Sequence, residues 1–258
     1  MTSTTPLPGW YTDSTNPALV RWWDGAAWTE HVRPHPGAAG NHAQQAQQAQ
    51  HPVGRLGAGP LFEVRELVLV EQAPAGNAAS YRYVDRHGNE IGSLHQTDEH
   101  GRTGMRLPGR ASQDTMYFRL FDAAGALLAA ITQPYQKASE IFKPRITVTD
   151  ARGRPVGEIK AETAGLGRNR MSFSVHGNRA GGLAATSWLS SKYTVVDDAK
   201  HQVAEIVKRE FSDFPLPDIP ANGDSYWLSR PSRLPEPLGT LVLLAPFALD
   251  NAYHSDTK

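Results

Sequence analysis

The run LGTLVLLAPFAL, residues 238–249, is the most apolar stretch of the chain, and its burial decides the fold. It contains no charged residue and no alternation of polar and apolar positions. A helix of this length spans ~18 Å, whereas the hydrocarbon core of a bilayer is ~30 Å thick and requires ~20 residues. The run is therefore too short for an ordinary membrane span, and a helix that is apolar on all sides must be buried within the protein.

Two residues within this run disfavour a regular helix. Pro246 removes one helix hydrogen bond and costs ~3 kcal/mol in an ideal helix interior, and Gly239 weakens the start. We therefore expect either a kink or a helix that begins late. The expected structural side chains of the buried helix are Leu241, Leu244, Phe247 and Leu249.

Upstream of this run, the sequence repeats a short strand, a tight turn and a second strand. An aspartate in such a turn accepts hydrogen bonds from backbone N–H groups ahead of it, and a glycine takes the left-handed conformation that closes the hairpin. Five hairpins are expected, beginning at residues 81, 117, 145, 171 and 193. Their aspartates are interpreted as turn-formers rather than acids or bases: Asp85, Asp122, Asp150 and Asp198.

The segments beside these turns alternate in polarity. In RITVTD (145–150), for example, Ile and Val alternate with Thr, which is typical of a strand with one buried face and one solvated face. Five hairpins supply about ten strands, and residues 62–70 and 225–229 each add one.

About twelve antiparallel strands form a barrel that is too wide to be filled by their own side chains. A central helix is one known filler. Strands of about six residues rise ~20 Å, which is close to the length of the apolar helix. The sequence therefore predicts a mainly β fold, in which an antiparallel barrel of about twelve strands encloses the C-terminal hydrophobic helix.

The N-terminal segment contains four of the six tryptophans. Asp24-Gly25 lies between two aromatic runs and is a strong hairpin signal. We predict a small Trp-rich β meander, in which large aromatic side chains supply most of the buried area. The expected organisation is this mini-domain at 6–34, a disordered Gln/Ala/Gly-rich linker at 35–60, the barrel at 61–250 with its helix at 238–250, and a tail at 251–258.

Composition excludes several classes of function. The 26 basic and 26 acidic residues give a net charge of zero, which argues against nucleic-acid binding. The absence of cysteine rules out disulfides, thiolate zinc sites and a cysteine nucleophile. No phosphate-binding loop, nucleophile elbow or HExxH motif is present, so an enzyme with a pocket in the barrel mouth has no motif in its favour. Residues 1–10 show no signal peptide, which favours a cytoplasmic location.

The string of hairpins followed by the ending LAPFALD (244–250) resembles the phospholipid scramblase and LURP-one-related group of the tubby C-terminal-like superfamily. This resemblance covers residues 61–253 and implies a twelve-stranded barrel around a central helix. It also implies association with phospholipid membranes. Lipid translocation is suggested by this resemblance alone and by no other feature of the sequence. The chain departs from the group because it has no cysteine cluster for lipid attachment.

The acidic residues before the closing helix are the candidate calcium ligands: Asp213, Asp218 and Asp224. They are separated by prolines, and their spacing does not match that of an EF-hand loop. The alternative is a proline-stiffened surface loop without a metal. His95 and His100 flank an acidic turn and could hold a metal or be solvated loop histidines. No other cofactor is expected.

At the N-terminus, PGWY (8–11) and RWWDGAAWTEH (21–31) resemble a short domain of unknown function found in many actinobacterial proteins. This resemblance brings no known activity. Its aromatic residues form either a mini-core or a groove that docks a proline-rich peptide. The candidate partner-binding residues are Trp10, Tyr11, Trp22 and Trp28.

Two basic segments are candidate binding sites for a phospholipid headgroup. Arg168 and Arg170 belong to a glycine-rich turn whose N–H groups and guanidiniums could hold a phosphate. Lys137, Lys143 and Arg145 surround Ile-Phe at 141–142, a pattern typical of a basic-aromatic patch at a membrane surface. The alternatives are a hairpin loop with surface arginines and an edge loop that packs its phenylalanine.

These observations favour a non-catalytic, scramblase-like protein that binds anionic phospholipids at the inner face of the cell membrane. Translocation would require a polar path through ~30 Å of hydrocarbon, which a barrel with an internal helix does not offer. The alternative is a cytoplasmic scaffold that joins a Trp-rich docking module to a barrel and binds a protein ligand. The sequence leaves the oligomeric state open.

Overall fold

A computed structural model of the chain describes residues 9–12, 19–34, 51–72, 78–103, 114–135, 144–162, 170–186, 191–209, 214–216, 218–219, 223–231 and 233–253. It separates into two compact units, Met1–Gln50 and His51–Lys258. Each unit has its own sheet.

The first unit is a three-stranded antiparallel sheet made of β1 (Gly9–Thr12), β2 (Leu19–Trp23) and β3 (Trp28–Pro34). In the turn between β2 and β3, the carboxylate of Asp24 accepts the N–H groups of Ala26 and Ala27 at 2.7 and 2.6 Å. These hydrogen bonds, chiefly the one from Ala27, lower the pKa of Asp24. Gly25 takes a φ of 101°. The predicted β meander is confirmed.

The second unit is a closed barrel of twelve antiparallel strands, which confirms the predicted fold class. The strands follow one another around the barrel in chain order, and the last pairs with the first. They are β4 (Glu66–Glu71), β5 (Ser80–Asp85), β6 (Glu90–Thr97), β7 (Met116–Asp122), β8 (Leu127–Gln133), β9 (Arg145–Asp150), β10 (Pro155–Glu162), β11 (Arg170–Val175), β12 (Asn178–Ala185), β13 (Lys192–Asp197), β14 (Gln202–Lys208) and β15 (Ser225–Ser229).

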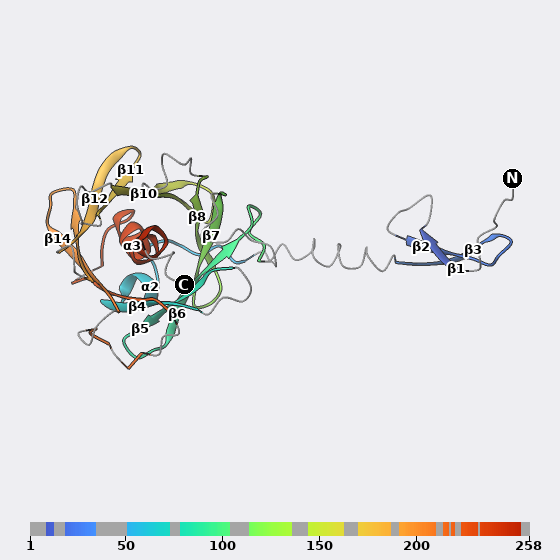
Figure 1. Ribbon diagram of the computed structural model, residues 1–258, viewed down its shortest axis with the longest axis horizontal. Coiled ribbons are helices and arrows are strands. Elements are labelled where there is room, and N and C mark those ends of the chain that lie inside the picture. The colour runs from blue at the N-terminus through green and yellow to red at the C-terminus, as the bar shows by residue number, and fades with distance from the viewer. Residues whose placement is uncertain are drawn as a thin grey trace. The chain divides into compact units, whose positions relative to one another are not determined.

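The C-terminal helix α3 (Leu238–Tyr253) lies inside the ring of strands (Figure 1). Every residue from 240 to 250 is buried. The ring of Phe247 lies 5.5 Å from that of Tyr81 on β5 and 4.8 Å from that of Phe118 on β7. Burial of each large apolar side chain contributes ~1.5–3 kcal/mol, so the helix is the centre of the core.

The helix begins at Leu238 and continues through Pro246, so the late start considered from the sequence is not found. In the turn before the proline, the carbonyl of Leu243 accepts the Tyr83 hydroxyl at 3.3 Å. At the start, the carboxylate of Glu236 accepts the backbone N–H of Thr240 at 3.3 Å and its hydroxyl at 2.6 Å. Packing on all sides holds the helix together where its own hydrogen bonding is weakened.

Residues 51–60, which the sequence assigned to the linker, contact the barrel. Val53 pairs with Leu127 in a parallel bridge, and Gly54 donates its N–H to the Leu127 carbonyl at 2.8 Å. The short helix α2 (Pro60–Glu63) then buries Leu61 and Phe62 in the core. The described part of the barrel unit therefore begins at His51, because the backbone of Val53 and Gly54 pairs with Leu127 and Leu56 packs against the core.

Five short turns lie at one end of the barrel, because each joins two neighbouring antiparallel strands in the order β5–β6, β7–β8, β9–β10, β11–β12 and β13–β14. We call this end the short-turn mouth and the opposite end the long-loop mouth. In the β9–β10 turn, Oδ1 of Asp150 accepts the N–H groups of Arg152 and Arg154, both at 2.9 Å. Gly153 lies in the left-handed region with φ 78°. The Asp85 and Asp122 turns have the same pattern, as predicted.

The fifth turn corrects one sequence assignment. Its turn-forming carboxylate belongs to Asp197, whose Oδ1 accepts the N–H of His201 at 2.8 Å, and not to Asp198, which is exposed. The reason is register, since β13 ends at Asp197 and the residue three positions later closes the turn. That residue is Lys200, which adopts φ 68° where the turns at Asp85, Asp122 and Asp150 have glycine.

We predict that Lys200→Gly raises the free energy of unfolding by up to about 1 kcal/mol. Relief of a left-handed side chain gains about 1–2 kcal/mol, and the added chain entropy of glycine costs about 0.5–1 kcal/mol. The reverse change in the matching turn, Gly153→Lys, should lower the free energy of unfolding by a similar amount. Urea denaturation measures both, and a Lys200→Gly variant no more stable than the parent chain contradicts the turn assignment.

Candidate functional site

The predicted headgroup-binding residues belong to two loops of the long-loop mouth, between β8 and β9 and between β10 and β11. Arg145 is the first residue of β9 and Arg170 the first of β11, and both side chains are exposed. Lys137, Lys143 and Arg168 lie outside the described residues. Because β9, β10 and β11 are consecutive in the barrel, the structure brings Arg145 and Arg170 to the same side of one mouth.

Lys160 on β10 joins this group and was missed from the sequence. It is the direct cross-strand partner of Arg145, and its side chain is exposed. Ile159 and Ala161 beside it are buried, so the alternation of β10 is the signal that could have placed Lys160 outside. Among the described residues no acid pairs with Lys160.

Acidic residues on the same face only partly offset these cations. Nη1 of Arg145 lies 4.0 Å from a carboxylate oxygen of Glu158, the limit of an ion pair. Glu162 is the register partner of Arg170 and lies 3.6 Å from Nη1 of Arg179. Like charges directly opposite on paired strands are destabilising, so the Arg145–Lys160 pair is a local cost that an external anion would relieve.

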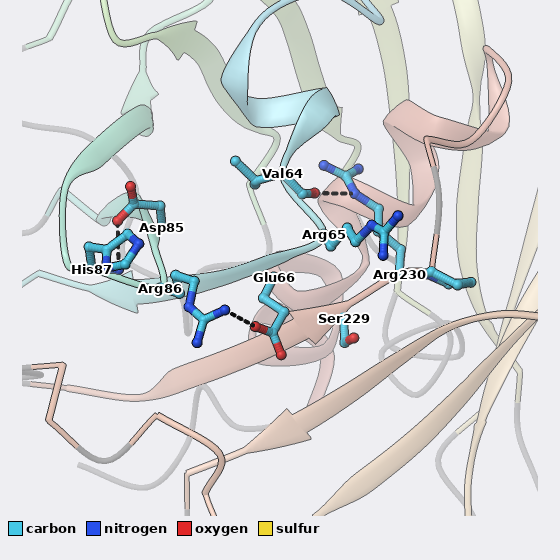
Figure 2. A pocket seen from close by; sticks show the side chains of 9 residues that line it. Val64, Arg65, Glu66, Asp85, Arg86, His87, Ser229 and Arg230 are labelled. Carbon is cyan, nitrogen blue, oxygen red and sulfur yellow. Dashed lines mark hydrogen bonds and ion pairs between the residues drawn. The ribbon is translucent and has the colours of Figure 1, made fainter.

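A pocket of about 530 Å³ opens at the short-turn mouth, where β4 begins and β5 and β15 end (Figure 2). No local sequence motif marks it, because its walls come from three separate segments of the chain. It is lined by Val64, Arg65, Glu66, Asp85, Arg86, His87, Ser229, Arg230 and Pro231.

Arg230 is the buried base of this pocket, with an exposed fraction of 2%. Its Nε donates to the carbonyl of Val64 at 3.1 Å, and its Nη2 donates to the carbonyl of Leu61. Burial lowers the pKa of Arg230 to about 10, and the negative charge of Glu236 partly opposes this shift. The guanidinium is therefore charged at neutral pH and held by main-chain carbonyls.

The other charged side chains of the pocket differ in the number of hydrogen bonds and ion pairs that they make within the protein. The carboxylate of Asp85 accepts hydrogen bonds from the turn that it forms, two from Asn89 and one from the N–H of His87. Burial alone would raise the pKa of Asp85, but these hydrogen bonds lower it overall. Arg86 lies 3.9 Å from Glu66 in a loose, exposed ion pair, and no described residue pairs with the side chain of Arg65.

The candidate calcium ligands are not brought together in the described residues. Asp213 lies outside them, and Asp218 is exposed beside Ile219, which is buried against the outer face of the barrel. Asp224 instead lies near Glu71 and Asp250, with the oxygens of the three within 4.8 Å of one another.

This acidic cluster has partners within the chain. Nζ of Lys208 lies 3.3 Å from Asp224, and the N–H of Asp224 donates to Glu71 at 3.2 Å. Asp250 accepts the hydroxyls of Tyr81 and Tyr226 at 2.6 and 3.1 Å. Burial, with the charge of Asp250, raises the pKa of Tyr226, which keeps its hydroxyl a donor. The cluster therefore fixes the C-terminal turns of α3 in the barrel.

The two histidines considered as metal ligands lie in different surroundings, His95 on a strand and His100 in the turn that follows it. His95 is half-buried on β6 beside Phe121, and burial lowers its pKa. The acidic turn that follows is another aspartate turn, in which Asp98 accepts the N–H and Nε–H of Arg102 at 2.8 and 2.7 Å. Among the described residues, neither His95 nor His100 belongs to a group of three potential metal ligands.

In the N-terminal sheet, Tyr11 and Trp28 are in edge-to-face contact at 5.9 Å, and Trp23 contacts Trp28 at 5.0 Å. Trp28 is 51% exposed. Residues alternate between the two faces of a strand, so Trp22 belongs to the opposite face of β2 from Trp23. The side chain of Trp10 lies outside the described residues. Trp23 was not among the predicted docking residues.

The chain therefore folds into a small N-terminal β sheet and a closed twelve-stranded antiparallel barrel around a C-terminal helix. Residues 8–52 match the family model described as "Protein of unknown function (DUF2510)", which identifies the N-terminal domain. No curated protein and no solved structure matches the chain. In the described part of the chain, none of the helices has the length and apolar character needed to span a membrane.

We predict that Tyr81→Phe lowers the free energy of unfolding by about 1.5–3 kcal/mol, the contribution of a hydrogen bond to a charged group. The substitution removes the hydroxyl that donates to the fully buried Asp250 and keeps the ring on Phe247. Tyr117→Phe on β7 is the matched control, because that hydroxyl bonds to no described residue. Thermal and urea unfolding measure both, and equal effects of the two substitutions contradict the proposed role of Asp250.

Proposed function

We propose that the protein is a non-catalytic module that binds the surface of anionic phospholipid membranes with the long-loop mouth of its barrel. The observation that carries this proposal is the cross-strand pair of exposed cations, Arg145 and Lys160, with Arg170 on the next strand. The basic residues of the adjoining loops, Lys137, Lys143 and Arg168, add to this positive charge in the sequence.

Electrostatics supports a surface interaction of this kind. Each lysine or arginine near an anionic leaflet contributes about 1 kcal/mol to binding, so several are needed for stable association. The net charge of zero means that attraction must come from a local patch rather than from the whole molecule. Because α3 occupies the barrel interior, we propose peripheral binding and not translocation through the barrel.

Flotation with vesicles of phosphatidylcholine and phosphatidylglycerol tests this proposal. Lys160→Glu should lower the partition coefficient by about 30-fold, because it removes one attractive charge and adds a repulsive one at about 1 kcal/mol each. The new glutamate faces Arg145 across the strand pair, so the fold should tolerate it. Binding should weaken with salt, which screens exposed charges.

Arg152→Glu is the matched control, because it makes the same charge change in the same hairpin but at the short-turn mouth. It should leave flotation nearly unchanged. Equal losses for the two variants would assign the attraction to net charge, and a parent chain that stays in solution at low salt would refute the proposal.

A second candidate function is docking of a proline-rich peptide on the N-terminal sheet. The contact between Tyr11 and Trp28, with Trp23 beside it, leaves Trp28 half exposed. Exposed aromatic rings of this kind dock the preformed extended helix of proline-rich segments. This candidate corresponds to the scaffold alternative, in which the sheet binds a protein ligand.

Indole N–H signals of the full chain report on such docking. A synthetic proline-rich peptide should shift the signals of Trp23 and Trp28, whereas that of Trp227, buried on the barrel wall, serves as an internal reference. The same peptide with alanine in place of proline should have no effect, and Trp28→Ala should abolish the shifts. Unchanged indole signals at millimolar peptide would exclude this candidate.

A further inference from the structure

The arginine-lined pocket of the short-turn mouth contains more positive charge than the protein itself uses. It lies at the opposite end of the barrel from the basic loops, because β4 begins and β5 and β15 end there. Its volume, about 530 Å³, falls within the range of about 300–1,000 Å³ that is usual for small-molecule sites.

Arg230 is the strongest feature of this pocket. A buried charge is costly unless a charge of opposite sign pairs with it, and the described residues hold no carboxylate within ion-pair distance of its guanidinium. Its contacts are the carbonyls of Leu61 and Val64, which orient the guanidinium without neutralising it. Glu236 acts on it only as a more distant negative charge.

The second arginine is adjacent to the first. The N–H of Arg230 donates to the carbonyl of Arg65 at 2.9 Å, so the two residues lie on neighbouring backbones where β15 meets β4. The side chain of Arg65 is exposed and has no partner among the described residues. Arg86 comes from the β5–β6 turn, and Figure 2 shows it next to Glu66, with the 3.9 Å ion pair drawn between them.

We propose that this pocket binds the phosphoryl group of a small soluble phosphate monoester. Arg65, Arg86 and Arg230 supply three positive charges, and Glu66 and Asp85 carry two negative ones, so the lining keeps a net charge of +1. The carboxylate of Asp85 is already held by the three N–H donors of its own turn. A phosphate monoester, which carries about −1.5 to −2 at pH 7, has the opposite sign, and guanidiniums bind phosphate oxygens in a bidentate manner.

The rest of the wall suits the organic part of such a ligand. Val64 and Pro231 provide apolar surface, and Ser229 and His87 offer hydrogen-bonding groups. Arg230 is the buried anchor of the site, whereas Arg65 and Arg86 are exposed at its rim, Arg86 in a loose ion pair with Glu66.

Calorimetric titration of the full chain with glycerol 3-phosphate tests this proposal, with sodium chloride at matched ionic strength as the blank. Arg65→Gln should weaken binding at least tenfold without loss of stability, because that exposed side chain makes no hydrogen bond or ion pair with a described residue. Arg152→Gln is the control, because it removes an exposed arginine from another turn of the same mouth. This control should bind like the parent chain.

The outcomes separate the sources of the phosphoryl group. Saturable binding of glycerol 3-phosphate that Arg65→Gln weakens and Arg152→Gln does not supports the proposal. Heat no larger than that of the chloride blank, or equal affinities of the Arg65→Gln variant and the parent chain, overturns it. Vesicles with phosphatidic acid form a second arm. If only vesicles bind and Arg65→Gln abolishes this, the pocket recognises a lipid headgroup, and the assignment to a soluble ligand is wrong.

Discussion

The width of a twelve-stranded barrel is the constraint on which the rest of the structure depends. Such a barrel encloses more space than the inward side chains of its strands can fill, and an unfilled apolar interior forfeits its packing contacts. The protein fills this space with α3, which is apolar on every side for that reason. Tyr83, Tyr81 and Tyr226 reach inward from the wall to bind the helix backbone and Asp250. The inward side chains of the barrel strands and those of α3 therefore form a single hydrophobic core.

The connections divide the barrel into two chemically different ends. At the short-turn mouth, aspartate carboxylates bind the backbone of their own turns and leave little of the chain loose. At the long-loop mouth, Arg145, Lys160 and Arg170 are exposed near the ends of β9, β10 and β11. A rigid wall thus separates two positively charged regions, one concave and lined by Arg230, the other spread over exposed strand ends. The ligands proposed for the two regions differ in size accordingly, a small molecule for the first and an extended membrane surface for the second.

Much of the fold could be predicted from the sequence, because the signals were local. Three of the five hairpin turns follow from an aspartate and a glycine three residues apart, and the buried helix follows from a run without charge. Errors arose where a one-residue register mattered, as when the fifth turn used Asp197 instead of Asp198. The entry segment at 51–60 was also misjudged, since its contacts with Leu127 and the core are far away in sequence.

The candidate sites were less predictable for the same physical reason. Arg65, Arg86 and Arg230 belong to three segments, and only the closure of β15 on β4 places Arg230 beside Arg65. Lys160 required the register between β9 and β10, which alternation alone does not fix. Conversely, Asp224, which suggested a metal in the sequence, has Lys208 and Glu71 as partners beside the C-terminal turns of α3, because polar side chains serve local structure as readily as ligands.

The order of the elements along the chain has a consequence for biosynthesis. The helix that fills the barrel is its last element, and all twelve strands precede it. At a translation rate of roughly 5–20 residues per second, α3 is completed about 1 to 5 s after β15. Until α3 is complete, the inward faces of the strands already made have no helix to pack against. The nascent chain is then most exposed to aggregation, and chaperones have their main opportunity to engage it.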